Sequence, residues 1–174
     1  MDVMTCLRTR LTVRTFLPDP VPDGVVTDLL QAARWAPSSR NLQPWHFVVV
    51  RERSLLQQIG ETATSGRFIS GAPLAIAVVM DKAERPGVDA GRVIQQMELA
   101  AWDRGLSTCF VGLKDVDQNR KIKELLDIPP HMELITVLPF GYRPPEIKGA
   151  GKDRKPLRDI AHSEKFGRPY TQEI

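Results

Sequence analysis

Apolar residues recur at helical spacing in five segments of the chain and form short continuous runs in four others. A spacing of three and four residues places side chains on one face of a helix, whereas a short β-branched run is typical of a buried strand. Capping residues support the boundaries, since Asp23 and Asp115 precede helical patterns and Gly105 follows one. The pattern therefore predicts helices over 2–9, 24–35, 53–64, 88–104 and 116–126, and strands over 47–50, 74–80, 108–112 and 134–138.

The segments between these elements are polar or rich in proline. Residues 14–22 are predicted to be extended, because a proline disfavours helix at the residue before it, and 66–73 is predicted to be a loop. From Gly141 onward the chain is rich in proline, glycine and lysine and has little capacity to build a core. This arm is either disordered or wrapped around a partner subunit. Spaced apolar anchors favour wrapping: Leu157, Ile160, Phe166 and Tyr170.

The length of 174 residues predicts one domain spanning 1–174, built as a sheet with helices on its faces. Apolar residues make up 42% of the chain and charged residues 26%, which is an ordinary globular composition. The net charge of +3 is small and dispersed, and no helix-turn-helix, zinc-finger or aromatic RNA-binding signature accompanies it. The composition therefore argues against a nucleic-acid partner.

The positions of the cysteines and histidines and the lengths of the apolar runs bear on metal binding and on cellular location. Cys6 and Cys109 lie far apart, and neither they nor the three histidines show a metal-type spacing. The longest apolar run, 72–80, is less than half of the ~20 residues needed to cross a bilayer. The N-terminus carries early arginines and no apolar signal-peptide core. We expect a cytoplasmic protein with no metal and no membrane partner.

A basic cluster near the N-terminus points to an anion. In an extended segment alternate residues project to one side, so Arg10, Thr12 and Arg14 would face a common point. Two planar guanidiniums and a hydroxyl suit a phosphate monoester, because they form charge-assisted and bidentate hydrogen bonds. A second alternating pair, Lys152 and Arg154, could close the same site. The alternative is ordinary solvated charge, which is common on protein surfaces.

A polar nonamer, residues 37–45, separates the second predicted helix from the first strand. Its serine, asparagine and glutamine side chains both donate and accept hydrogen bonds. The pyrimidine edge of a flavin alternates carbonyls and an N–H and needs such mixed partners. Flanking prolines restrict the loop before it binds. The alternative is a polar helix-to-strand connection made of turn residues, with Trp45 in the core.

Taken together, these stretches resemble the FMN-dependent nitroreductase family. The resemblance rests on an arginine-rich start, the stretches AARWAPSSRNLQPWHFVVV and GLSTCFVG, and a late Lys-x-Arg shortly before Pro-Leu, and it covers essentially the whole chain. It implies a three-layer α+β sandwich with helices flanking a mixed, mostly antiparallel sheet, and a C-terminal arm exchanged with the partner. It also implies a homodimer with FMN at the interface, NADH or NADPH as donor, and ping-pong transfer to nitroaromatic, quinone or related small-molecule acceptors.

The resemblance also assigns cofactor contacts to particular residues. It places the first cluster on the FMN phosphate and ribityl chain, with threonine in place of the more usual serine, and the loop of the nonamer on the flavin of the other subunit. It places the backbone of Val111 and Gly112, at the end of the third predicted strand, near flavin N5, where a backbone N–H could bond it. The cofactor-binding residues that it implies are Arg10, Thr12, Arg14, Pro37, Ser38, Ser39, Asn41, Gln43, Val111, Gly112, Lys152 and Arg154.

Other candidate residues have weaker assignments. Arg67 could stabilise the anionic reduced flavin at its N1–C2=O edge, or it could be a surface arginine. Cys109 is expected to be buried and not nucleophilic, and Asp89 and Glu98 to be solvated helix positions. No side chain is predicted to be a catalytic acid, base or nucleophile. Two further readings share these motifs: a specialised flavin enzyme for flavin fragmentation, dehalogenation or dehydrogenation, and a non-catalytic FMN-binding protein.

Overall fold

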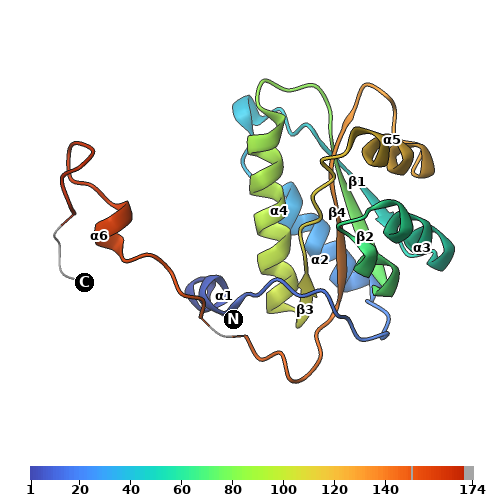
Figure 1. Ribbon diagram of the computed structural model, residues 1–174, viewed down its shortest axis with the longest axis horizontal. Helices are drawn as coiled ribbons and strands as arrows, with labels where there is room; N and C mark the ends of the chain where they lie inside the picture. The colour runs from blue at the N-terminus through green and yellow to red at the C-terminus, as the bar shows by residue number, and fades with distance from the viewer. Residues whose placement is uncertain (150, 171–174) are drawn as a thin grey trace.

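The computed structural model describes residues 1–149 and 151–170 (Figure 1). Every helix and strand that the apolar pattern predicts is present, with boundaries shifted by a few residues. The α-helices are α1 (Val3–Thr9), α2 (Asp23–Arg34), α3 (Arg53–Thr62), α4 (Pro86–Asp103), α5 (Val116–Leu125) and the short α6 (Leu157–Ile160). The strands are β1 (Trp45–Val50), β2 (Leu74–Met80), β3 (Leu106–Thr108) and β4 (Glu133–Tyr142), and two 3-10 helices are η1 (Ser39–Asn41) and η2 (Arg67–Gly71).

The four strands form one sheet in the order β1-β2-β4-β3. All three strand pairs are antiparallel, with Trp45 opposite Met80 at one end of the β1–β2 pair. An isolated bridge between Thr12 and Thr108 is parallel and adds the N-terminal segment beside β3. The sheet is thus mixed and mostly antiparallel, as predicted.

Helices cover both faces of this sheet and make three layers (Figure 1). Because side chains alternate along a strand, β2 sends Leu74, Ile76 and Val78 to one face and Ala75, Ala77 and Val79 to the other. The first face packs against α2 and α4, and the second against α3, α5 and η2. All seven residues of β2 are buried, so this strand is the centre of the core. The structure confirms the α+β class with helices on both sides.

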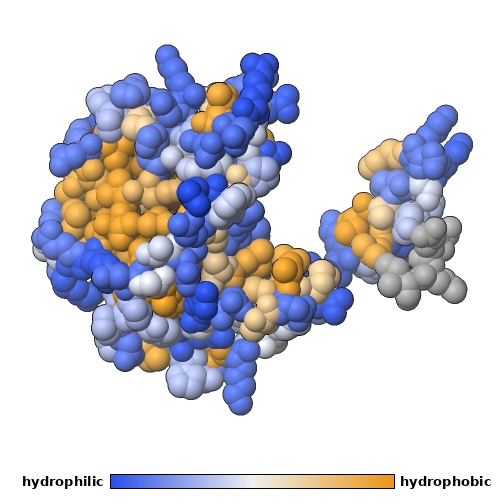
Figure 2. Space-filling model, turned by 180° about the vertical axis from the view of Figure 1, so that it is seen from behind, coloured by the Kyte–Doolittle hydropathy of each residue, from blue (hydrophilic) through white to orange (hydrophobic). Residues whose placement is uncertain are grey.

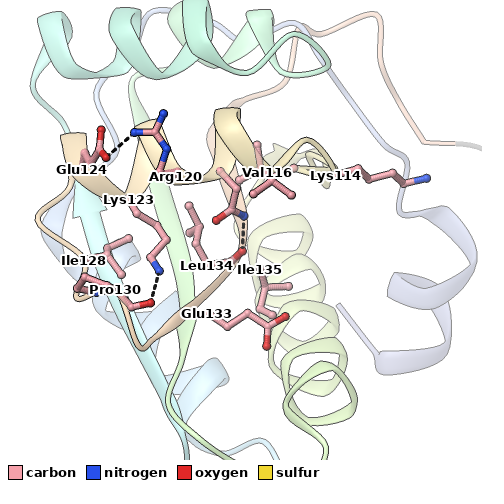
Figure 3. A pocket seen from close by; sticks show the side chains of 12 residues that line it. Lys114, Val116, Arg120, Lys123, Glu124, Ile128, Pro130, Glu133, Leu134 and Ile135 are labelled. Carbon is pink, nitrogen blue, oxygen red and sulfur yellow. Dashed lines mark hydrogen bonds and ion pairs between the residues drawn. The ribbon is translucent and has the colours of Figure 1, made fainter.

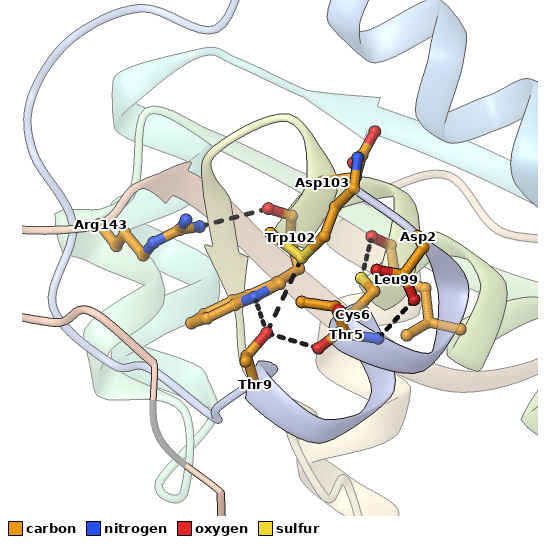
Figure 4. A network of polar contacts seen from close by, with 9 residues as sticks. Asp2, Thr5, Cys6, Thr9, Leu99, Trp102, Asp103 and Arg143 are labelled. Carbon is orange, nitrogen blue, oxygen red and sulfur yellow. Dashed lines mark hydrogen bonds and ion pairs between the residues drawn. The ribbon is translucent and has the colours of Figure 1, made fainter.

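A small polar network fixes α1 against the end of α4 (Figure 4). The indole Nε1 of Trp102 donates to Thr9 Oγ1 at 3.0 Å, and the Cys6 thiol donates to the carbonyl of Leu99 at 3.3 Å. The guanidinium of Arg143 lies over the Trp102 ring, 4.1 Å from its centroid. These contacts determine where the basic segment after α1 begins, because Arg10 is the C-cap residue that follows the last residue of α1.

The structure corrects several boundaries. Residues 66–73, predicted to be a loop, contain η2. The third strand is Leu106–Thr108 and not 108–112, because pairing with β4 ends where Thr108 lies opposite Phe140. Strand β4 continues through Gly141 and Tyr142, so the arm starts after the sheet and not at Gly141. Asp23 is the first residue of α2 and makes no side-chain cap; Pro22 precedes the helix.

The C-terminal arm leaves the body of the molecule and carries α6 away from it (Figure 1). Helix α6 has no buried residue, and Leu157, Ile160 and Phe166 are 50%, 56% and 92% exposed. Figure 2 shows apolar surface on the arm, and a broader apolar area on the body seen from behind. The exchange of the arm between subunits stays a prediction, which the exposed apolar side chains of the arm support.

Candidate functional site

The basic segment after α1 is extended, and its side chains alternate as predicted. The N–H of Val13 donates to the carbonyl of Thr108 at 3.1 Å, and Val13 is buried. Thr12 and Arg14, on either side of it, are exposed, and Arg10 is half-buried. The first cluster therefore projects from one side of a segment that β3 holds in place.

Glu98 of α4 lies beneath this segment. Its carboxylate is 3.5 Å from Arg10 Nη1, and the residue is only 8% exposed. The prediction that Glu98 is solvated is wrong, because the N-terminal segment folds over this part of α4. Burial raises the pKa of Glu98, and the positive charges of Arg10 and Lys152 oppose the rise. Lys152 thus acts electrostatically on the same carboxylate as Arg10. Arg154 is exposed and donates to the carbonyl of Asp153.

Two buried polar atoms in this region have no hydrogen-bond partner within the described chain. They are Nη1 of Arg10 and Oγ1 of Thr108. Buried polar groups in folded proteins almost always make a hydrogen bond, so a guanidinium nitrogen that has only a 3.5 Å ion pair with Glu98 marks a place where a ligand can bind. The donors here, one of them charged, fit a phosphate group better than they fit any cation. The residues present are therefore compatible with the phosphate end of FMN.

Arg14 extends from the same segment toward η2. Its guanidinium carbon is 5.8 Å from the centroid of the Phe68 ring. It also lies beside Cys109, which is 1% exposed, as predicted. Burial raises the pKa of the Cys109 thiol, and the charge of Arg14 opposes this rise. A buried thiol with a raised pKa is a poor nucleophile, so Cys109 is part of the packing.

Val111 and Gly112 follow β3 without joining the sheet. The Val111 N–H donates to Thr136 Oγ1 at 3.3 Å, and the Thr136 hydroxyl donates to the Val111 carbonyl at 2.9 Å. The Val111 N–H is therefore used within the protein, and the predicted contact to flavin N5 narrows to Gly112. The carbonyl of Gly112 accepts from Ser65 Oγ at 2.8 Å, which holds this stretch of backbone in place. A Cβ atom on Gly112 would meet no other atom within 4 Å, so the space beside its backbone is open.

The 37–43 loop (Pro37–Gln43) includes η1 and is held by its own side chains and by α4. Ser38 Oγ accepts from the Gln43 N–H at 2.9 Å, and the Gln43 side chain donates to the carbonyl of Asn41 at 3.3 Å. The Ser39 N–H donates to Asp89 of α4. Asp89 is 1% exposed, so the prediction that it is solvated is also wrong. The reason is local, because the loop folds over this end of α4.

The loop and the basic segment contact α4 at different ends. Asp89, which holds the loop, and Glu98, which holds Arg10, are separated by about 13 Å along the helix axis and by two and a half turns. They therefore face opposite sides of α4, and Figure 1 shows α1 beside the end remote from the start of the helix. Within the described residues, the two predicted halves of the FMN site therefore contact opposite sides of α4.

Arg67 is the first residue of η2 and precedes Phe68, the residue that Arg14 contacts. It is exposed and lines a polar pocket of about 460 Å³ with residues of α3, among them Arg53 and Glu61. None of the residues predicted to bind the FMN phosphate lines that pocket. The assignment of Arg67 to the flavin edge stays a prediction.

A further cavity of about 710 Å³ lies between α5 and β4 (Figure 3). Several of its polar side chains are bonded to neighbouring protein groups. Lys123 Nζ donates to the carbonyls of Pro130 and Met132, and Asn119 donates to the carbonyl of Leu134 at 2.9 Å. None of the residues predicted to bind FMN lines it. This cavity is therefore not the candidate site.

Comparison with known proteins decides the family. The model of the nitroreductase family matches residues 7–86 and 65–142 of this chain. The chain belongs to the nitroreductase family. This membership confirms the resemblance and identifies the protein as an oxidoreductase. A Methanothermobacter thermautotrophicus protein provisionally named NADH dehydrogenase/NAD(P)H nitroreductase is 34% identical over 172 residues, covering 95% of this chain and 88% of the relative.

Solved structures of this family have the same fold. An FMN-dependent nitroreductase from Clostridium difficile R20291 superposes with a TM-score of 0.84 at 28% identity, covering 94% of this nitroreductase-family chain and 100% of the other. A structure from Parabacteroides distasonis ATCC 8503, provisionally named NADH dehydrogenase/NAD(P)H nitroreductase, also gives 0.84 at 27% identity, covering 91% and 96%. Within the described part of the chain, no helix is both long and apolar enough to span a membrane.

Proposed function

We propose that this protein is an FMN-dependent oxidoreductase. It takes hydride from NADH or NADPH and passes electrons to a nitroaromatic, quinone or related acceptor by a ping-pong mechanism. The observation that carries the proposal is the buried Nη1 of Arg10, beside Thr12 and Arg14, in a chain of the nitroreductase family: it forms an ion pair with Glu98 at 3.5 Å but has no hydrogen-bond partner within the described chain. A buried charged donor whose hydrogen bond is unmade is the group that a phosphate-bearing cofactor would satisfy.

The chain's own residues bind and orient the cofactor. Arg10, Thr12 and Arg14 hold its phosphate, and Lys152 and Arg154 add positive charge from the arm. The Gly112 backbone N–H donates toward the flavin ring. Bound FMN supplies the redox chemistry, so no side-chain acid, base or nucleophile is needed. The protein contributes position and electrostatic stabilisation, which are the usual contributions of a protein to cofactor chemistry.

The cofactor lies between two copies of the chain in this proposal. The 37–43 loop and the basic segment face opposite sides of α4, so a homodimer is the arrangement that lets the loop of one copy reach the phosphate site of the other. The arm, with its exposed Leu157, Ile160 and Phe166, packs on the partner. Residues 1–174 form one domain of this dimer, and two unpaired, buried cysteines suit a cytoplasmic protein.

The first experiment is an absorption spectrum of the purified protein, followed by denaturation and identification of the released chromophore. We expect flavin bands near ~370 and ~450 nm and free FMN. Anaerobic mixing with NADH, and separately with NADPH, should then bleach the longer-wavelength band. A flavin that stays oxidised with both donors indicates a non-catalytic binding protein. A protein that neither contains nor takes up FMN overturns the proposal.

Variants test the phosphate contacts. Arg10→Ala and Arg14→Ala should each weaken FMN binding by about 1.5–3 kcal/mol, the value of a hydrogen bond to a charged group. Arg104→Ala is the matched control, because Arg104 pairs with Asp28 at the surface and lies outside the proposed site. Equal FMN affinity in all three variants and the parent contradicts the phosphate assignment. Sedimentation of an FMN-loaded monomer contradicts the interface site.

A further inference from the structure

Asp89 is a buried carboxylate that the redox chemistry does not use. It lies in the first turn of α4 and is 1% exposed. Its Oδ1 is 3.1 Å from Arg92 Nη1, and its Oδ2 accepts from the Ser39 N–H at 3.4 Å. A buried charge is tolerated only when it is paired and hydrogen-bonded, and the two oxygens of Asp89 have one partner each. One of those partners is the backbone of the 37–43 loop.

Arg92 adds a second connection to the same loop. The Nη1 atom that pairs with Asp89 also lies 3.5 Å from the carbonyl of Pro37, to which it donates. The Asp89–Arg92 pair thus contacts the loop at both Pro37 and Ser39, on either side of Ser38. The carboxylate accepts from one backbone N–H of the loop and the guanidinium donates to one backbone carbonyl, so the pair fixes both the position and the orientation of the loop backbone.

The loop needs such support because its backbone is strained. Arg40, Asn41 and Gln43 have φ angles of 51°, 56° and 50°, in the left-handed region that residues other than glycine rarely adopt. Strained residues of this kind persist only when the surrounding structure holds them. All three are exposed, so packing does not hold them. The support comes from the hydrogen bonds within the loop and from the anchor on α4.

We propose that Asp89, paired with Arg92, is a positioning residue that holds the 37–43 loop in its binding conformation. The inference rests on the proposed function in one respect, because the loop is the part that reaches the flavin. Asp89 itself touches no cofactor. It acts through the Ser39 N–H, and its loss should loosen the loop without removing any cofactor contact.

The test compares Asp89→Ala with Asp89→Asn. The alanine variant loses both contacts, whereas the asparagine variant keeps an oxygen that accepts from Ser39. We expect Asp89→Ala to weaken FMN binding about tenfold or more, the effect of losing a hydrogen bond to a charged group. Asp89→Asn keeps the acceptor for Ser39 but loses the ion pair with Arg92, so it should recover part of this loss. Asp28→Ala is the control, since it breaks an exposed ion pair with Arg104 at 2.8 Å, remote from the loop.

A second readout follows the loop without FMN. Arg40 is exposed inside the loop, so trypsin can cut after it once the loop opens. Cleavage of the cofactor-free protein at the Arg40–Asn41 bond, followed by mass spectrometry, should be faster in Asp89→Ala than in the parent and the control. Equal cleavage rates and equal FMN affinity in Asp89→Ala and Asp28→Ala overturn the inference.

Failure of the proposed function and failure of the positioning role of Asp89 give different results. If the parent protein does not bind FMN, the proposed function falls, and the cleavage rates alone decide whether Asp89 positions the loop. If Asp89→Ala does not fold, Asp89→Asn and Arg92→Ala provide the comparison, and Arg92→Ala should also accelerate cleavage. Should all folded variants cleave at the parent's rate, the positioning role is refuted whether or not FMN binds.

Discussion

The close approach of Gly66 to Val111 gives a prediction whose size follows from the structure. A Cβ atom on Gly66 would lie 2.7 Å from Val111 Cγ1 and 3.1 Å from both Ala63 Cβ and Ile69 Cδ1. The φ angle of Gly66 is −125°, which any residue adopts, so an alanine there is opposed by contacts and not by its backbone.

The neighbours of Gly66 have little freedom to move away. Ala63, Ile69 and Val111 are at most 1% exposed, and Val111 is held by both hydrogen bonds to Thr136. Overpacking of this kind costs about 1–3 kcal/mol. Replacing glycine by alanine also restricts the unfolded chain, which stabilises the fold by about 0.4–1 kcal/mol. The steric term is larger, so Gly66→Ala should lower the free energy of unfolding by roughly 0.5–2.5 kcal/mol.

Urea denaturation followed by circular dichroism measures this change. The Val111→Ala background provides the control, because it removes the Cγ1 atom that the new methyl group meets. In that background Gly66→Ala should cost less, with a coupling of at least about 0.5 kcal/mol. The reasoning is refuted if Gly66→Ala leaves the midpoint unchanged, or if it costs the same in both backgrounds.

Three further predictions follow from buried polar groups. Burial raises the pKa of Glu98 above its ordinary value of 4.5, so the folded protein holds a proton at pH values where the unfolded chain has lost it, and the free energy of unfolding should increase as the pH falls from the raised pKa toward 4.5. Urea titrations at several pH values measure this slope, which Glu98→Gln should abolish. Thr136→Val should lower stability by about 1–3 kcal/mol in the same assay, because it leaves the buried N–H of Val111 without a partner; an unchanged midpoint would contradict this. Trp102→Phe removes the hydrogen bond to Thr9 and should lower the melting temperature by an amount equivalent to about 0.5–1.5 kcal/mol; Trp35→Phe, at a 76% exposed position, should leave it unchanged.

The apolar pattern predicts the elements well because each helix and strand buries a face that local spacing reveals. Helix α4 illustrates both the success and the limit. Its inward positions include Val93, Met97 and Ala101, which the spacing identifies. Asp89 and Glu98 lie one helical turn from Val93 and Ala101 respectively, at the borders of this apolar stripe, and both were expected to be solvated. A border position is exposed or buried according to what folds over it, and that depends on segments remote in sequence.

In the candidate site, too, features set by local spacing can be predicted from the sequence, and features set by contacts between remote segments cannot. The alternation at residues 10–14 is visible in the sequence, because it reflects the geometry of one extended segment. The use of the Val111 N–H by Thr136 is not visible, since it joins residues 25 positions apart. Nor does the sequence show that β3 ends at Thr108: the apolar residues after it resemble a strand, but Val111 packs against the α3 and α5 side of the sheet without strand pairing.

The placement of Asp89 and Glu98 on one rigid helix restricts how the chain can change in length. One residue inserted between them would shift one contact by about 1.5 Å relative to the other and rotate it by about 100° about the helix axis. Either the loop anchor or the Arg10 contact would then point away from its partner. The exposed connection at 82–85, by contrast, precedes α4 and touches neither contact. Insertions and deletions among relatives should therefore fall in that connection and not within the nine-residue interval of α4.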